Sequence, residues 1–437
     1  MEAITGEIIE PKSLKGFDVT YTEGKLEIQA GMGLEIDSSI EGVLIRRKGM
    51  MIGGYIWFHL AFPFEGIKDA NGKQIIFGNM IIPVDYYIEH CASNEFSELH
   101  IAFPELNYFL PSHLLLKWDT DPMTVNKKPQ KVSEFSFLFQ RRKVDFLLQS
   151  VANFSLKPSA GANIETYNEI ILKFSQTGNM KFIIGLLNII YSLFSFLYNR
   201  TNIHIEETVL IGTDEPSSRH KLHYVNMRLP IKDDDEKSMR KAPNFNLLKN
   251  HFEKLFMLFV KSKVACGALP SSEKDKSLYD LKRALSLTSI FELNRVELLP
   301  EIPVSEERKI AYANSKSSIE LLANKAQGKI KKIYKEIAKS LNNPFVSLEQ
   351  SIIKVYEGYI GWGKLTNVFN ADGGITPSAQ TVAKFRNALV HGKEIPKPGK
   401  SFFNGFKTLE KINFCIVYRK AGYSDKTIKQ ILEIMQI

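Results

Sequence analysis

Residues 381–392 read TVAKFRNALVHG, and this stretch decides how the C-terminal half of the chain is interpreted. Its apolar residues Val382, Phe385 and Leu389 fall on one stripe of a helical wheel. We therefore expect an amphipathic helix whose apolar stripe packs against other helices of a bundle.

The limits of this helix can also be predicted. Ser378 is a residue type that caps helix starts, and Gly392 suits the left-handed residue that ends a helix. Pro396 and Pro398 prevent the helix from continuing. The sequence therefore predicts a helix over residues 377–391.

The polar residues of the same helix form the candidate site. Asn387 and His391 are four residues apart, so they share the face opposite the apolar stripe. Arg386 lies five residues before His391, about 140° away around an ideal helix. Either the last turn is distorted, or two copies of the motif meet across a two-fold axis. We favour the two-fold arrangement, because a dimer lets groups from paired helices converge on one strand.

Long stretches of helical periodicity surround the motif. Beyond Pro243 the apolar residues recur with a period of about 3.6. Short connections between long amphipathic helices predict an antiparallel bundle. The predicted helices cover residues 245–264, 276–298, 306–341, 347–369, 377–391, 402–421 and 425–435.

The first 230 or so residues instead have the composition of strands, rich in β-branched and aromatic side chains. Strands are expected within residues 44–64, 74–84, 135–148, 165–174, 204–212 and 220–229, with turns such as Asn71-Gly72 between them. Residues 181–198 form an apolar helix that is long enough to approach a membrane span. Its polar interruptions and the flanking strands favour a buried helix packed on the sheet.

These patterns predict an α+β protein with a β-rich N-terminal domain followed by an all-α antiparallel bundle. We place the N-terminal domain at residues 1–235 and the helical region at residues 236–437, with the core of the bundle at about 300–437. A polar linker that contains Asp233-Asp234-Asp235 separates the two.

The positive charge of the chain is confined to its C-terminal third. The net charge is +9, and residues 301–437 contain 22 Lys and Arg against 12 Asp and Glu. A basic domain beside a nearly neutral one indicates a polyanionic partner, although a solvated basic surface gives the same count. The lysine-rich residues 325–339 are either a solvated helix face or part of an RNA channel.

Other residue types argue against several classes of site. Three widely spaced cysteines, Cys91, Cys266 and Cys415, do not suggest a disulfide framework and fit a reducing cytoplasm. The N-terminus lacks the pattern of a signal peptide. His220 and His223 have the spacing of metal ligands, but the sequence nearby offers no further ligand. We therefore expect neither a metal nor a cofactor.

The motif from Arg386 to His391 resembles the signature of the HEPN superfamily, in which Arg and His are separated by four to six residues and the second residue is often polar, as Asn387 is. The order of domains also resembles that of the ApeA-type anti-phage proteins, and residues 196–200 (FLYNR) look typical of their N-terminal region. The resemblance implies a metal-independent endoribonuclease and homodimerisation through the helical domain. It also implies abortive-infection defence in a bacterial cytoplasm.

The three side chains fit that chemistry. RNA supplies its own nucleophile, the 2′-hydroxyl. His391 can take and give a proton near neutral pH, and Arg386 can grip a phosphate and stabilise its developing charge. Asn387 can orient the phosphate or the hydroxyl. The predicted catalytic residues are therefore Arg386, Asn387 and His391, and the predicted products are a 2′,3′-cyclic phosphate and a 5′-hydroxyl.

Three interpretations follow. In the first, the N-terminal domain senses a phage-derived trigger and the bundle cuts RNA, with tRNA, mRNA and rRNA all open as substrates. In the second, a HEPN-like bundle binds RNA or a protein without cutting. In the third, residues 181–198 anchor an effector at a membrane. On structural grounds alone, His391 is a favourable cation at a helix C-terminus and Asn387 is surface.

Overall fold

The computed structural model describes the following residues: 3–29, 34–36, 40–48, 55–64, 67–68, 70, 74–76, 79–89, 95–110, 116–117, 124–125, 129–157, 161–203, 205, 207–212, 218–224, 236–300, 304–341, 346–360, 374–392, 394 and 398–436. The chain forms two compact units. Unit 1 comprises Met1–Lys249 and Ser271–Asp275, and unit 2 comprises Asn250–Pro270 and Lys276–Ile437. The predicted boundary at Asp235 and the predicted turn Asn71-Gly72 lie outside the described residues.

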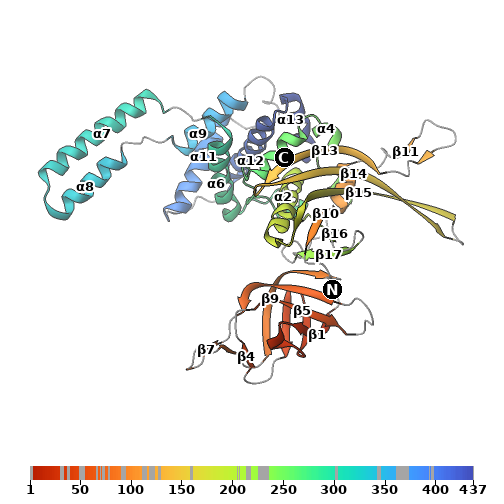
Figure 1. Cartoon of the computed structure of the whole chain (residues 1–437). Helices are drawn as coiled ribbons and strands as arrows, with labels where there is room; N and C mark the ends of the chain where they lie inside the picture. The colour runs from red at the N-terminus through yellow and green to blue at the C-terminus, as the bar shows by residue number, and fades with distance from the viewer. Residues whose placement is uncertain are drawn as a thin grey trace. The chain divides into compact units, whose positions relative to one another are not determined.

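Unit 1 begins with a closed antiparallel barrel (Figure 1). Its strands follow the order β9-β3-β2-β1-β5-β6, and β6 pairs with β9 to close the barrel. Alternating side chains point inward, and the rings of Tyr21, Phe58 and Tyr87 meet there with centroids 5.0 to 5.3 Å apart. The barrel strands are β1 (Ile4–Glu10), β2 (Asp18–Thr22), β3 (Lys25–Gln29), β5 (Ile40–Arg47), β6 (Tyr55–Phe64) and β9 (Asn79–Glu89).

A second antiparallel sheet continues from the barrel through β9. Glu89 pairs with Ile56 of β6 and with Lys221 of β17, so β9 belongs to both sheets. The order of the second sheet is β13-β14-β15-β10-β16-β17. Its strands are β10 (Phe96–Ala102), β13 (Gln130–Phe139), β14 (Arg142–Lys157), β15 (Gly161–Thr177), β16 (Glu207–Gly212) and β17 (Arg219–Tyr224).

Short elements complete unit 1. They are the turn η1 (Lys12–Leu14), the strands β4 (Leu34–Ile36), β7 (Ile67–Lys68), β8 (Gln74–Ile76), β11 (Leu116–Lys117) and β12 (Thr124–Val125), the helices α1 (Pro104–Phe109), α3 (Glu236–Met239) and α4 (Phe245–Leu248), and the turn η4 (Glu273–Asp275).

Helix α2 (Met180–Tyr198) packs on one face of the second sheet. Phe182 contacts Phe174 of β15 at a ring-centroid distance of 5.3 Å, and Phe194 contacts Phe103 at 4.7 Å. This helix has the length and mean hydropathy (1.8) of a membrane span, but 61% of that apolar window is buried. The structure therefore has it as a core helix of the β-rich unit, in agreement with the favoured interpretation of residues 181–198.

A buried ion pair fixes the end of α2. Asn199 ends the helix in the left-handed conformation, with φ 49°. Arg200 then donates from Nη2 to Glu105 Oε1 of α1 at 3.0 Å, and both side chains are almost fully buried. The hydroxyl of Tyr198 donates to the carbonyl oxygen of Glu105 at 2.6 Å. The segment FLYNR therefore has a structural role in tying α2 to α1.

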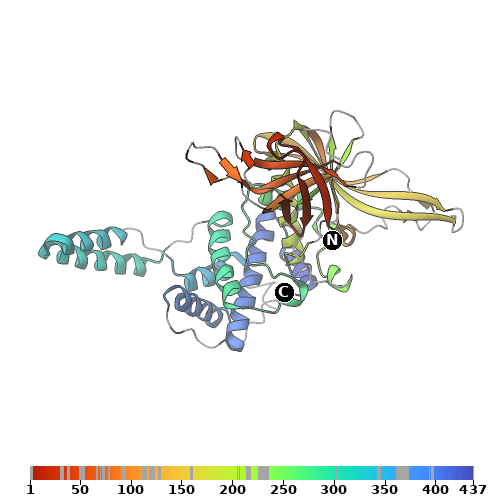
Figure 2. The same cartoon turned by 90° about the horizontal axis from the view of Figure 1, so that it is seen from below.

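Unit 2 is helical (Figure 2). Its central helix α12 is buried along nearly all of its second half, from Thr408 to Tyr418. The helices are α5 (Phe252–Val260), α6 (Leu281–Leu298), α7 (Glu306–Lys325), α8 (Gly328–Ser340), α9 (Leu348–Lys354), the π-helical turn η5 (Val355–Ile360), α11 (Ile375–Val390), α12 (Lys400–Ala421) and α13 (Asp425–Met435).

The predicted single helix over residues 306–341 is wrong. Ala326 and Gln327 are extended, and the chain reverses into the hairpin of α7 and α8. The small side chains of Ala323 and Ala338 are buried in the hairpin. In both views the hairpin projects away from the other helices of unit 2 (Figures 1 and 2). The lysine-rich residues 325–339 therefore lie mainly on α8.

The predicted helix over residues 347–369 is changed as well. Ser347 caps α9 by accepting a hydrogen bond from the backbone of Gln350 at 3.3 Å. The helix then widens into the π-helical turn η5, and residues 361–373 lie outside the described part of the chain. At the level of fold class, the chain has a β-rich N-terminal region that contains a barrel and a helical C-terminal portion.

Candidate functional site

The predicted motif lies on α11, which packs closely on α12. Val382 and Phe385 are buried, and the ring of Phe385 meets that of Phe402 at 4.5 Å. Leu389 is only half-buried, and Ala388 takes its place on the buried face. Gly405 permits the close approach of the two helices, because a Cβ there would lie 3.3 Å from the carbonyl oxygen of Ser378.

The predicted start of this helix is wrong, whereas its end is close to the prediction. Helix α11 begins at Ile375 after Gly374, so Ser378 is a buried residue of the second turn and not a cap. The buried face extends to Ile375, two residues before the predicted start, and this added burial is the physical reason. Gly392 has φ 61°, as expected for the left-handed residue after a helix. Pro396 lies outside the described residues.

The three polar residues lie at the exposed end of α11. Asn387 and His391 are exposed, and Arg386 is half-buried. Arg386 Nη1 lies 3.4 Å from Asn387 Oδ1, which is a long and weak hydrogen bond. Within the described residues, no other hydrogen bond or ion pair engages the side chains of these three residues.

The backbone keeps Arg386 and His391 apart. Helix α11 is regular through Val390, and the amide of His391 still donates to the carbonyl oxygen of Asn387 at 3.1 Å. The ideal separation of about 140° between positions 386 and 391 therefore applies. A single protomer brings Arg386 to Asn387, and it does not bring Arg386 to His391.

Neighbouring charged residues do not complete the group. Glu357 of η5 is exposed, and no ion pair joins it to Arg386 or His391 within the described residues. The thiols of Cys266 and Cys415 are poor nucleophiles near neutral pH, because burial raises the pKa of each to about 12. Cys91 lies outside the described residues.

A second polar group, which the sequence analysis missed, is buried between α6 and α12. Arg283 donates to Glu410 Oε1 at 2.7 Å, and the hydroxyl of Tyr279 donates to the same carboxylate. Burial, reinforced by the nearby Lys407, lowers the pKa of Lys411 to about 8. The charged pair Glu410 and Lys411, shortly before the apolar run from Phe414 to Tyr418, was the available signal.

The histidine pair of β17 does not form a metal site. His220 and His223 are an odd number of residues apart and therefore point to opposite faces of the strand. His223 lies 3.0 Å from Glu89 and stacks on Tyr87. Within the described part of the chain, no group of three or more His, Cys, Asp and Glu side chains could hold a metal ion.

Comparisons with known proteins give no relative for this chain. No family model, no curated protein and no solved structure matches it.

Proposed function

We propose that this chain is a metal-independent endoribonuclease whose active site contains Arg386, Asn387 and His391. One observation carries the proposal. Three side chains suited to phosphodiester chemistry lie at the exposed end of a helix and have almost no bonds within the described part of the chain. The resemblance of the motif to the HEPN signature, and the basic character of the C-terminal third, support RNA as the substrate.

The chemistry assigns each side chain a step. The imidazole of His391 takes the proton of the 2′-hydroxyl, or gives one to the leaving 5′-oxygen, and it can do either near neutral pH. Arg386 pairs with the non-bridging phosphate oxygens and stabilises the charge that builds there. Asn387 is already linked to Arg386, so it can hold the guanidinium or the phosphate in place. The products are a 2′,3′-cyclic phosphate and a 5′-hydroxyl.

The separation of Arg386 and His391 makes the proposed site a dimeric one. We propose that two copies of α11 meet across a two-fold axis, so that Arg386 of one protomer and His391 of the other contact one phosphate. The exposed position of Asn387 and His391 leaves room for such a meeting. In this scheme unit 1 receives the phage-derived trigger, and unit 2 cuts RNA to abort the infection.

The first experiment measures cleavage by the full chain. Purified protein is incubated with total cellular RNA in EDTA, and the 5′ ends of the fragments are sequenced. We expect discrete fragments from the wild type and from Lys426→Ala, which removes an exposed cation on α13. We expect none from His391→Ala or Arg386→Ala, each with an unchanged circular dichroism spectrum. Equal cleavage by a folded His391→Ala protein would refute the proposal.

The second experiment tests the shared site. His391→Ala and Arg386→Ala proteins are unfolded, mixed and refolded together. If each site takes Arg386 and His391 from different protomers, half of the dimers are mixed and each has one intact site, so roughly a quarter of wild-type activity returns. No recovery means that the two residues act within one protomer. RNA binding without cleavage in the first experiment would favour a binding module.

A further inference from the structure

The face of the second sheet opposite α2 carries a group of charged and polar side chains. The side chains of Leu99 of β10 and Ile170 of β15 point to the face that α2 covers. Successive residues of a strand point to opposite faces, so His100, next to Leu99, and Glu169, next to Ile170, point to the other face. Buried apolar residues such as Ile171 and Val209 share that face with them.

A cavity of about 320 Å³ opens on this face. Apolar residues of β10 and β16 line part of it, and its polar lining comes from four strands. The polar residues are His100, Tyr167, Glu169, Glu207 and Arg219. All of them belong to unit 1, so the cavity does not depend on the placement of unit 2.

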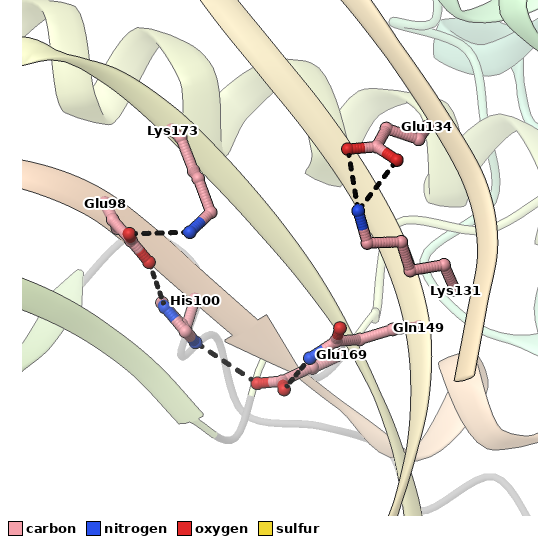
Figure 3. Close-up of polar contacts among 7 residues, drawn as sticks. All are labelled: Glu98, His100, Lys131, Glu134, Gln149, Glu169 and Lys173. Carbon is pink, nitrogen blue, oxygen red and sulfur yellow. Dashed lines mark hydrogen bonds and ion pairs between the residues drawn. The ribbon is translucent and has the colours of Figure 1, made fainter. Parts of the chain in front are cut away.

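One side of the cavity is a fixed network of charges (Figure 3). The ring of His100 bridges two carboxylates, with Nδ1 3.2 Å from Glu169 and Nε2 3.0 Å from Glu98. A neutral imidazole has a single N–H, so both bonds are satisfied only by the imidazolium form. Gln149 donates to the second oxygen of Glu169 at 2.7 Å, and Lys173 donates to Glu98 at 2.8 Å.

The ionisation of these groups follows from the same contacts. Burial alone would lower the pKa of His100, but the hydrogen bonds to Glu169 and Glu98 outweigh it and raise the pKa. Burial alone would raise the pKa of Glu169, but the bonds from His100 and Gln149 outweigh it and lower the pKa. The carboxylate of Glu169 is therefore charged and held in one orientation.

The other side of the cavity presents groups that have no such bonds. Within the described residues, the carboxylate of Glu207, the guanidinium of Arg219 and the hydroxyl of Tyr167 make no hydrogen bond or ion pair. Glu207 and Arg219 are exposed at the rim, and Tyr167 is half-buried. One free carboxylate and one free guanidinium thus face the same space without neutralising each other.

We propose that this cavity binds a small zwitterion of the α-amino acid class. The ammonium group of the ligand pairs with Glu207, beside Glu169. The carboxylate of the ligand pairs with Arg219 and accepts a hydrogen bond from the hydroxyl of Tyr167. A zwitterion supplies a partner of opposite charge to each of these two rim groups. A singly charged ligand leaves one charge unpaired, and a neutral heterocycle leaves two. The volume is at the lower end for ligand sites, as a small metabolite requires.

Titration calorimetry of the full chain tests this assignment and does not depend on RNA cleavage, because the His391→Ala protein can be titrated as well. The probes are the standard α-amino acids one at a time, the N-acetyl derivative of any amino acid that binds, and guanosine. We expect at least one amino acid to bind with one site per chain, and its N-acetyl derivative to bind at least about tenfold more weakly.

Variants at the rim locate the binding. Glu207→Gln and Arg219→Ala are each expected to weaken binding at least about tenfold, since each removes a charge-assisted bond. Lys221→Ala is the matched control, because it removes an exposed cation of the same strand that does not line the cavity. The proposal is overturned if none of the amino acids binds, if guanosine alone binds, or if both rim variants bind as tightly as Lys221→Ala.

Discussion

The side chain of Arg283 joins three segments of unit 2, and its replacement by methionine tests how that unit is held together. Arg283 donates to Glu410 of α12 at 2.7 Å, to the carbonyl oxygens of Leu278 and Lys276 at 2.6 and 2.9 Å, and to that of Ala268 at 3.2 Å. Its guanidinium also lies 4.3 Å from the centroid of the Tyr279 ring. Methionine retains the apolar volume and removes every donor.

The magnitude follows from burial. The side chains of Arg283 and Glu410 are 9% and 4% exposed, so solvent cannot replace the lost partner. Removing one member of a buried ion pair costs about 3–5 kcal/mol, because the remaining charge is left uncompensated. A domain of this size is stable by only about 5–15 kcal/mol. Arg283→Met is therefore expected to remove a large part of the free energy of unfolding of unit 2.

Urea unfolding followed by far-ultraviolet circular dichroism measures the effect. With a slope of about 2 kcal/mol per molar urea, the midpoint of the helical transition should fall by roughly 2 M. Arg283→Met combined with Glu410→Leu should lose less than Arg283→Met alone, because the orphaned carboxylate is gone. Arg386→Ala is the matched arginine control and should stay within about 0.5 kcal/mol of the wild type. An unchanged midpoint for Arg283→Met would refute the reasoning.

Two further predictions concern the other described contacts. His100→Gln should destabilise unit 1 more at about pH 6 than at about pH 9. The pKa of His100 is raised in the folded protein, so its charged form contributes to the free energy of unfolding. That contribution is fully present below the ordinary pKa of 6.5 and is lost as the pH rises through the folded pKa. Equal losses of urea midpoint at both pH values would contradict this. Gly405→Val should cost about 1–3 kcal/mol, because a Cβ at Gly405 already lies 3.4 Å from Val382 Cγ2 and the branches would push α11 from α12. Gly405→Ala should be much milder in thermal melts, since the gain in helix propensity offsets the tighter contact.

The sequence predicts the local parts of this fold well. Helix α13 spans Asp425–Met435 as expected, because Ser424 caps it and its apolar residues are regularly spaced. The break between α7 and α8 was missed, because no proline interrupts residues 306–341 and their apolar period continues across it. The reversal buries Ala323 and Ala338 in the hairpin, and local patterns do not encode that packing.

The barrel was also beyond local patterns. Strands β1, β2 and β3 alternate buried and exposed side chains, which is typical of strands, but this local pattern does not specify which strands pair. Closure depends on the pairing of β6 with β9, which are distant in sequence. Within the barrel, Gly42 of β5 also allows the ring of Trp57 of β6 to approach closely, because a Cβ at Gly42 would lie 2.4 Å from that ring.

The candidate sites show the same division between local and distant information. The helix that carries Arg386, Asn387 and His391 was predicted because all its signals lie within about twenty residues. The bond from Tyr279 to Glu410 spans 131 residues, and that from His100 to Glu169 spans 69. Polar groups that meet only after folding leave no spacing in the sequence, so both buried networks required the structure.

The three arginines Arg200, Arg283 and Arg386 differ in burial and in their bonding partners. Arg200 and Arg283 are buried and bonded to carboxylates, so folding explains both of them. Arg386 is half-buried and makes one weak bond to its own neighbour Asn387. The field at a helix C-terminus favours a cation by about 0.3–1 kcal/mol, which gives His391 a structural reason but gives none to Asn387. Among the described residues, Arg386 has no charged partner. The proposed phosphate held between two copies of α11 would supply one from outside the protomer.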